Sequence, residues 1–419
     1  MDDVASAENL FRAAARARRG KSRKPEVEDW WLRRETEIAA LREELLAGAY
    51  RPGPCRTFEI FEPKRRMIVA APFRDRVVHH ALCNLLAPSL QRRFIARSFS
   101  CQLGKGTTAA RECCRILTNR YRYVLKCDVR KFYANLDHRI LREKLTPYLP
   151  CSRAAELVDL IVAAHRTESD ETPPDFFPGD DWVAVMERPR GVPIGNLTSQ
   201  LWGNFYLDAM DHALTEGERH GAYLRYTDDF LLFSDAKQRL WDFHARIMEE
   251  LARVRLRLAE PKSRLLATRE GVPFCGFRFL PGLRPRILGA TKRRFEARRH
   301  ALWRAGPDWR AIGISVFSWY QFSREGNSEG LRRAYAHWPF DPRLRRRRGR
   351  TDRVLRGGSW NNNDPRNLLS SNRNNDHPGN RNDNNGFRVV LSSSSPKAEH
   401  GGAMAGGCGL LARSQEESA

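Results

Sequence analysis

Three aspartates stand where the chain could hold divalent metal ions. Asp228 and Asp229 are adjacent in the tetrapeptide Tyr226-Thr227-Asp228-Asp229, and Asp128 ends a separate apolar stretch. Hard divalent cations prefer carboxylate oxygens, and two such ions about 3.5–4 Å apart can make a hydroxyl group nucleophilic and neutralise a reacting triphosphate. Crowded carboxylates repel one another, so they are costly without a cation. The adjacent pair alone also fits a polar hairpin tip, but the third carboxylate favours a two-metal site.

Apolar stretches beside these aspartates predict the elements that position them. Three strands are predicted: residues 121–128, 223–226 and 230–233. Between the first and the second, Leu197, Leu201 and Phe205 fall at i, i+4 and i+8, and they predict one stripe of a helix packed on the sheet. The predicted fold class is therefore α+β, with a cleft above the sheet.

Further elements are predicted outside this core from helical spacing, alternation and composition. They are a helix over 29–49 that stops at Gly48, paired strands over 58–71 with a turn at 64–66, a helix over 73–86, a surface insertion over 166–190 and a helical module over 285–340.

The composition indicates a polyanionic partner. Lys and Arg number 73 against 50 Asp and Glu, which gives a formal net charge of +23 spread along the chain. Neutralising phosphates releases condensed counterions, so this surplus favours binding of nucleic acid over a merely soluble basic protein. No apolar run of about 18 residues and no signal-peptide pattern occur, so we expect a cytoplasmic protein without a membrane anchor.

Five ordered blocks resemble those of reverse transcriptases. The Tyr226-Thr227-Asp228-Asp229 tetrapeptide matches the Y-x-D-D turn of that family, and the other blocks occur in the family's order between residues 30 and 340. They are residues 128–138 for motif A, 191–207 for motif B, 259–265 for motif D and 273–279 for motif E.

The resemblance implies a right-hand polymerase with fingers, a palm that contains an antiparallel sheet, and a helical thumb. The implied division is an N-terminal helical extension over 1–49, fingers and palm over 50–284, thumb over 285–342, and an Arg-rich linker with an Asn-rich tail over 343–419.

Carried over residue by residue, the resemblance implies a metal site and a proton donor. Asp128, Asp228 and Asp229 would bind two Mg²⁺ ions, with Mn²⁺ as an alternative ion and Asp229 as a direct or an indirect ligand. Val129 would offer a backbone carbonyl. Lys262 matches the motif D lysine that protonates the leaving pyrophosphate, although a solvated lysine beside a proline turn is the alternative.

The resemblance also implies a nucleotide pocket. Tyr133 matches the aromatic residue that clashes with a ribose 2′-hydroxyl, so it would select deoxynucleotides; an ordinary buried tyrosine is the alternative. Lys64 and Arg65 would clamp triphosphate oxygens, unless they form a solvated basic turn. Gly195 and Gln200 of motif B would line the pocket for the dNTP and the template.

Two parts of this sequence differ from the pattern of many reverse transcriptases. Gln102 stands where many relatives have a phosphate-binding arginine, and Lys105 could take its place. In motif B, Ile194 replaces a glutamine that helps to position the template base, and the form I-G-N-x-x-S-Q is characteristic of diversity-generating retroelements. Isoleucine offers only van der Waals contact, so poorer base discrimination is expected. The alternative is an isoleucine that simply packs beneath the helix of an accurate enzyme.

The C-terminal segment has a different composition. Residues 361–385 hold eleven asparagines, whereas the 360 residues before them hold seven. The RGGSW and GFRVV sequences resemble the closing segment of formylglycine-generating-enzyme-like C-type-lectin domains, the usual display scaffold of these retroelements. Asn codons contain two adenines, the base that such elements rewrite. We expect residues 351–419 to reflect overlap of the gene with its template repeat; a disordered or ligand-binding appendage is the alternative.

These resemblances imply an RNA-directed DNA polymerase that copies a template-repeat RNA into adenine-mutagenised cDNA for retrohoming. Its partners would be template RNA, a cDNA or DNA primer, dNTPs and a basic accessory variability protein. The rival enzyme is a retron-type or group II intron-like reverse transcriptase, against which Ser199, Gln200 and the tail argue. A rival of another class is a catalytically inactive nucleic-acid-binding protein, which the three aspartates oppose.

Overall fold

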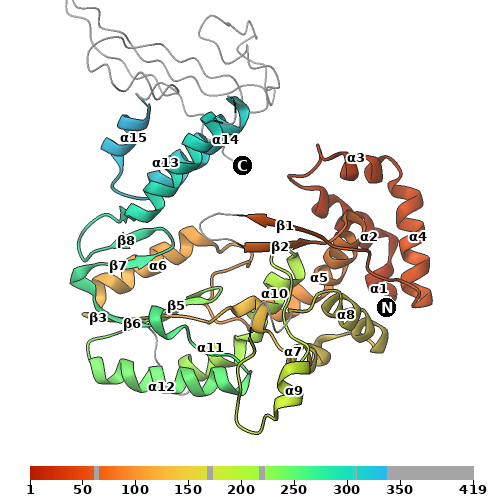
Figure 1. Cartoon of the computed structure of the whole chain (residues 1–419), viewed down its shortest axis with the longest axis horizontal. Helices are drawn as coiled ribbons and strands as arrows, with labels where there is room; N and C mark the ends of the chain where they lie inside the picture. Colours follow the sequence, from red (N-terminus) through yellow and green to blue (C-terminus); the bar gives the residue numbers. More distant parts are fainter. Residues whose placement is uncertain (61–65, 168–172, 217–221, 305, 307–308, 337–419) are drawn as a thin grey trace, which may run out of the picture. The chain divides into compact units, whose positions relative to one another are not determined.

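The computed structural model describes residues 1–60, 66–167, 173–216, 222–304, 306 and 309–336 (Figure 1). The chain divides into two compact units, Met1–Pro285 and Arg286–Ala419, and each is described by itself. Lys64, Arg65 and the Asn-rich tail, for which roles were predicted, lie outside the described residues. Within the described ranges, no helix is long and apolar enough to cross a membrane.

An antiparallel four-stranded sheet lies at the centre of the first unit (Figure 1). Its strands run in the order β4–β5–β3–β6. They span β3 (Tyr123–Asp128), β4 (Tyr223–Tyr226), β5 (Asp229–Ser234) and β6 (Arg264–Ala267). The four residues after Asp229 are apolar and fully buried, as expected for a strand with both faces covered. The three predicted strands and the α+β fold class are confirmed.

Helices surround this sheet. Strands β3 and β5 pack against α12 (Lys237–Arg253), and α10 (Leu197–Tyr206) packs mainly against α5 (Phe73–Arg93). The predicted stripe on α10 is only partly right, because Leu201 and Phe205 are buried but Leu197 is 36% exposed. Leu197 is the first residue of α10.

The N-terminal region is helical. It comprises α1 (Asp2–Ala5), α2 (Ala7–Arg18), α3 (Pro25–Leu32) and α4 (Arg34–Ala47), and α2 packs along α5. The single helix predicted over 29–49 was wrong, since the backbone leaves the helical region at Arg33, where φ is −98° and ψ is 14°. Gly48 closes α4 with φ of 70°, a conformation that glycine adopts without a steric penalty.

Two hairpins belong to the first unit. Strands β1 (Arg56–Ile60) and β2 (Arg66–Ala70) pair in an antiparallel register, which confirms the predicted strand pair. The second hairpin joins β7 (Val272–Phe274) to β8 (Phe277–Phe279) and packs against α6 (Thr107–Arg120).

The predicted surface insertion is attached more firmly than its composition indicated. Its short helix α9 (Trp182–Glu187) is followed by Arg188, which is 8% exposed and pairs with Asp180 at 2.5 Å. Arg255 pairs with Asp137 at 2.9 Å and with Asp180 at 3.5 Å. These ion pairs join the insertion to the segment after α12 and to Asp137, which caps the N-terminus of α7 (His138–Leu145).

The remaining elements of the first unit are η1 (Phe132–Asn135), α7 (His138–Leu145), η2 (Thr146–Tyr148), α8 (Ser152–Ala163), α11 (Asp208–Thr215), η3 (Glu260–Lys262) and η4 (Thr268–Glu270). The second unit contains β9 (Arg286–Ile287), α13 (Gly289–Arg304), α14 (Trp309–Arg324) and α15 (Glu329–Ala336). Phe295 stacks on Trp319 with ring centroids 4.4 Å apart, and Tyr335 meets Phe295 edge-on at 5.3 Å. This aromatic cluster holds the three helices together.

Candidate active site at the end of the central sheet

The strand register brings the three aspartates to one end of the sheet. Asp128, the last residue of β3, lies opposite Asp229, the first residue of β5. Because Tyr226 also lies opposite Asp229, the turn between β4 and β5 consists of Thr227 and Asp228 alone. The backbone N–H next to Asp128, that of Val129, donates to the carbonyl oxygen of Asp228 at 3.3 Å. Residues about 100 positions apart in the sequence therefore meet in one place.

Two lysines neutralise these carboxylates. Lys126 Nζ donates to Asp229 Oδ2 at 2.7 Å, and Lys262 forms an ion pair with the Asp128 carboxylate. Burial raises the pKa of Asp229, the charge of Lys126 opposes that rise, and the charge of Asp228 adds to it. The site thus balances negative charge with nearby ammonium groups.

The candidate site includes a carboxylate oxygen of the kind that divalent cations prefer. Asp229 Oδ1 is buried and has no hydrogen-bond partner among the described residues, which is costly for a carboxylate oxygen. In the described part of the chain, however, no three His, Cys, Asp or Glu side chains converge in a geometry that could hold a metal ion. A cation at this end of the sheet would have carboxylate oxygens within reach.

Tyr133 lies beside the aspartates. Burial raises the pKa of its hydroxyl, and the charge of Asp228 raises it further. Its ring approaches α10 closely, because a Cβ atom added to Gly203 would lie 3.2 Å from Tyr133 and 3.1 Å from Phe132. Tyr133 thus lies within the electrostatic reach of Asp228, and Gly203 has a packing role that the sequence did not indicate.

The motif B residues lie on the loop and the first turns of α10. Gly195 has φ of 113°, and a Cβ atom there would lie 3.5 Å from Ile68 of β2. Ile194 is half-buried. Gln200 is exposed, and its Oε1 accepts a hydrogen bond from the Cys101 thiol at 3.3 Å. Motif B therefore connects β2 with the segment before α6.

The segment before α6 does not present a free phosphate ligand at the expected positions. Gln102 Nε2 donates to the Ser98 carbonyl at 2.7 Å, and Lys105 Nζ donates to the carbonyls of Ile95 and Ser98 at 3.2 and 2.9 Å. Burial lowers the pKa of Lys105. Both side chains stabilise their own loop.

Some residues at the site were not predicted. Lys126 stands two positions before Asp128, on a strand whose apolar pattern it interrupts. That interruption was a usable signal, since a charged residue inside a buried strand needs a partner. Arg225 carries the same signal, since it is a charged residue inside the buried strand β4, whereas Ser100 carried none.

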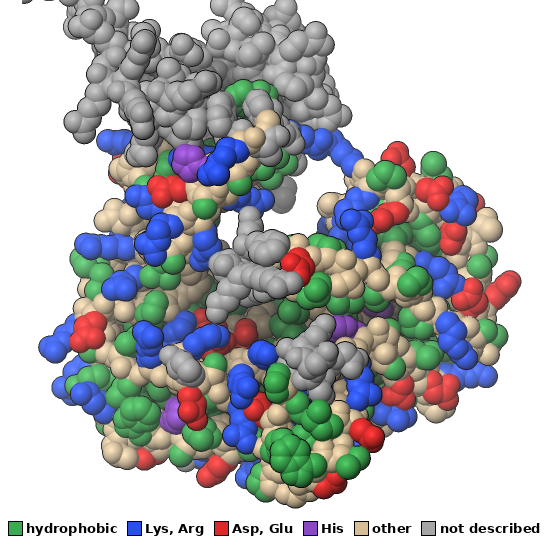
Figure 2. All heavy atoms as spheres, in the orientation of Figure 1, with side chains coloured by type: hydrophobic (Ala, Val, Ile, Leu, Met, Phe, Trp, Pro, Cys, Tyr) green, Lys and Arg blue, Asp and Glu red, His purple; other side chains and the backbone are tan. Residues whose placement is uncertain are grey.

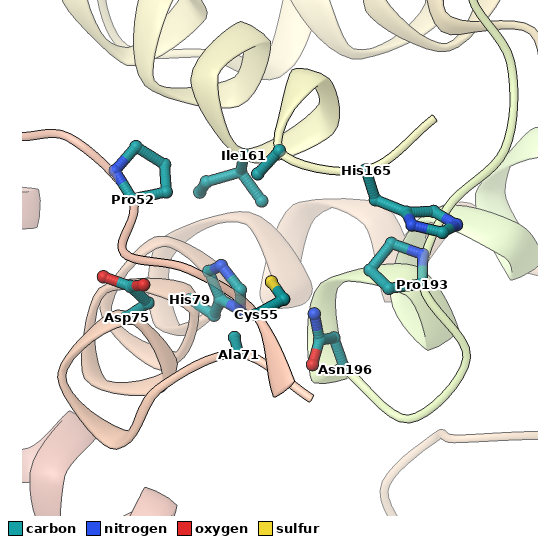
Figure 3. Close-up of a pocket in the computed structure, with 10 residues that line it drawn as sticks. Pro52, Cys55, Ala71, Asp75, His79, Ile161, His165, Pro193 and Asn196 are labelled. Atoms are coloured by element: carbon teal, nitrogen blue, oxygen red, sulfur yellow. The ribbon is translucent and has the colours of Figure 1, made fainter. Parts of the chain in front are cut away.

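A separate small pocket lies away from the aspartates (Figure 3). The close-up shows His79 and Asp75 of α5 facing Ile161 of α8 and the motif B residues Pro193 and Asn196. None of the three aspartates lines it. The pocket is therefore not the reaction centre, although it adjoins the loop that leads into α10.

Comparison with known proteins agrees with this geometry. A family model described as reverse transcriptase (RNA-dependent DNA polymerase) matches residues 61–279, and one described as sulfatase-modifying factor enzyme 1-like domain matches residues 316–393. Protein YkfC of Escherichia coli K12 is 24% identical, over 58% of this chain and 71% of its own.

Among solved structures, the telomerases of Candida tropicalis and Candida albicans are each 14% identical, with TM-scores of 0.39 and 0.38. They are matched over 54% and 57% of this chain, which spans only 47% and 46% of their own lengths. The family match to residues 61–279 covers more than half of the chain and includes all three aspartates. The chain belongs to the reverse transcriptase family and is an RNA-directed DNA polymerase.

Proposed function

We propose that this polymerase copies a template-repeat RNA into adenine-mutagenised cDNA for a diversity-generating retroelement. The observation that carries the proposal is Ile194. This half-buried aliphatic residue begins the I-G-N-x-x-S-Q sequence of motif B, which ends at Gln200. A side chain without a hydrogen-bonding group at this position favours loose discrimination between bases. In the proposed architecture, residues 50–284 form the fingers and palm and residues 285–342 form the thumb.

The proposed catalytic centre consists of Asp128, Asp228 and Asp229, with the carbonyl of Val129. These groups would hold two Mg²⁺ ions, or Mn²⁺, which activate the primer 3′-hydroxyl and neutralise the triphosphate. The ion pair between Lys262 and Asp128 supports a further proposal, that Lys262 carries a proton to the leaving pyrophosphate.

Tyr133 and Gln200 complete the proposed pocket. The position of Tyr133 beside Asp228 supports its role in excluding a ribose 2′-hydroxyl. The exposure of Gln200 supports contact with the dNTP or the template.

Primer extension on an RNA template tests the catalytic assignment. The double variant Asp228→Ala, Asp229→Ala should lose about a thousandfold or more of the activity, because it removes carboxylate oxygens that hold the ions. Asp235→Ala is the matched control, since Asp235 follows β5 at the opposite end and accepts from the Arg122 N–H at 2.9 Å. Equal activity in the double variant and the control would refute the assignment.

The family match in the C-terminal part of the chain supports a reverse transcriptase of a diversity-generating retroelement over other kinds of reverse transcriptase. The sulfatase-modifying factor enzyme 1-like match over residues 316–393 includes the asparagine-rich segment. We propose that residues 351–419 reflect a reading frame that runs into the template repeat. The surrounding DNA tests this: a near-copy that differs mainly at adenine positions should lie close by, and its absence would exclude the overlap.

An accessory protein is the proposed partner besides template RNA, primer and dNTPs. Helix α9 exposes three apolar side chains, with exposed fractions of 74% for Trp182, 65% for Val183 and 49% for Met186. Figure 2 shows hydrophobic side chains gathered at the edge of the first unit where Figure 1 places α9. Exposed apolar patches of this kind commonly mark protein interaction sites. The acidic neighbours Asp181 and Glu187 favour a basic partner.

A further inference from the structure

The backbone of the Thr227–Asp228 turn is strained. Thr227 has φ of 59°, a left-handed conformation that β-branched residues rarely adopt. Such a conformation persists only when surrounding contacts hold it. Asp228 follows immediately, so whatever holds Thr227 also determines where the Asp228 carboxylate lies.

Arg225 holds the turn from inside the protein. Its side chain is completely buried, and its Nη1 donates to the Thr227 carbonyl at 3.0 Å and to Asn204 Oδ1 at 3.1 Å. Its Nε donates to both carboxylate oxygens of Asp211, at 2.8 and 3.0 Å. The buried charge is thus fully compensated, and the planar guanidinium is fixed in orientation.

Ser100 holds the turn from the neighbouring segment. Thr227 Oγ1 donates to Ser100 Oγ at 2.8 Å, and the Ser100 carbonyl accepts from Asn204 Nδ2 at 2.6 Å. The same segment pairs with β4, because Phe99 N–H donates to the Arg225 carbonyl at 3.0 Å. Ser100 is 3% exposed, so water does not compete for these bonds.

These contacts form one connected set with Asn204 of α10 at its centre. Asn204 meets both Arg225 and Ser100, and Gln200 lies one helical turn earlier on the same helix. We propose that Ser100 and Arg225 are positioning residues, which hold Thr227 in its left-handed conformation and thereby fix the Asp228 carboxylate for metal binding. This inference rests on the proposed role of Asp228 as a metal ligand.

Ser100→Ala tests the inference with little risk to folding. Loss of one hydrogen bond to the turn should lower kcat about tenfold with less than about a twofold change in KM for dNTP. It should also raise the Mg²⁺ concentration that gives half of the Mg²⁺-induced rise in melting temperature. Ser98→Ala is the matched control, because Ser98 is buried in the same segment but its hydroxyl contacts Gln102 and not the turn.

Two further variants separate positioning from folding. Thr227→Gly accepts a positive φ without strain, so its melting temperature should not fall, while its kcat should fall as in Ser100→Ala. Combining it with Ser100→Ala should lower kcat by less than the two single effects together, since both changes remove the bond between Thr227 and Ser100. Arg225→Lys, which cannot keep the paired contacts to Asp211, should lower kcat and weaken the Mg²⁺ response.

The outcomes distinguish the inference from the proposed function. If Ser100→Ala behaves like Ser98→Ala in kcat and in its Mg²⁺ response, the positioning role is wrong. If Asp228→Asn keeps the full Mg²⁺ response, the proposed role of Asp228 is wrong.

Discussion

Lys126 is the residue whose contacts most constrain the candidate site. It donates to Asp229 at 2.7 Å and to the Pro273 carbonyl at 3.1 Å, and it lies 5.8 Å from the Phe274 ring centroid. It therefore links a carboxylate of the candidate site to the β7–β8 hairpin. This hairpin is thus held through the same side chain that neutralises Asp229.

Lys126→Met should destabilise the first unit. The substitution leaves Asp229 without its ammonium partner, and because both side chains are partly exposed the expected loss is about 1–2 kcal/mol of unfolding free energy. Denaturant unfolding in EDTA measures it. Adding Asp229→Asn should recover part of the loss, since the double variant has no unpaired charge. If the loss of stability in the double variant equals the sum of the losses in the two single variants, Lys126 and Asp229 do not interact.

The sequence identified the three aspartates but not the residues that hold them. Asp128, Asp228 and Asp229 stand out because carboxylates end apolar strands. Arg225 and Ser100 could not be found in this way, since their partners lie on α10, on α11 and in the turn, and they meet only when the chain is folded. Charge inside a buried strand shows that a partner exists, not which residue it is.

At the scale of elements, Gly203 determines how closely α10 approaches η1. Its hydrogen leaves room for the Phe132 and Tyr133 rings, which would lie 3.1 and 3.2 Å from an added Cβ atom. These rings pack with centroids 5.1 Å apart, so neither can move without disturbing the other. The helix that carries Gln200 and the aromatic residue beside Asp228 are therefore positioned together.

Gly203→Ala should lower stability by about 1–3 kcal/mol, because the added methyl group overpacks this contact. Gly313→Ala in α14 is the matched control, since nothing lies within 4 Å of its added Cβ atom. That control should gain about 0.5–1 kcal/mol from higher helix propensity. Thermal unfolding of the two variants measures both effects, and a stable Gly203→Ala variant would show that the rings can move apart.

The elements themselves were largely predictable where a local pattern determined them. The runs that became β3, β4 and β5 contain buried aromatic and aliphatic residues, and they were recognised from sequence. The break at Arg33 was missed because no proline or glycine marks it, and the exposure of Leu197 depends on which partner α10 meets. Such features are decided by tertiary packing, which periodicity does not contain.

At the scale of the whole molecule, a buried histidine makes stability depend on pH. His79 is 5% exposed, its Nδ1 has no hydrogen-bond partner among the described residues, and burial lowers its pKa from 6.5 to about 4. The unfolded chain therefore binds a proton between these values that the folded chain does not. Stability is fully present above pH 6.5 and falls as the pH drops toward 4.

His79→Gln should reduce this dependence; part of it should remain, because burial also lowers the pKa of His80 to about 4. The wild type should lose up to about 3 kcal/mol more than the variant between pH 6.5 and 4, since each pKa unit corresponds to about 1.4 kcal/mol. Denaturant unfolding at several pH values between these limits measures the difference. Parallel pH profiles for the two proteins would show that His79 is not responsible.

Two family models match different parts of this chain. The reverse transcriptase match lies within the first compact unit, whereas the sulfatase-modifying factor enzyme 1-like match begins in α14 and continues beyond the described residues. The change to asparagine-rich sequence after residue 360 lies within the second match and did not mark its start at residue 316. The origin of the tail depends on the gene and its neighbourhood, which the folded chain does not contain.

The error spectrum of the polymerase tests the central claim most directly. The measurement is deep sequencing of cDNA made by the wild-type protein, with its RNA and partners, from an RNA of defined sequence. We predict that substitutions concentrate opposite template adenines, as the proposed diversity-generating retroelement requires. Errors spread evenly over the four template bases would contradict the account.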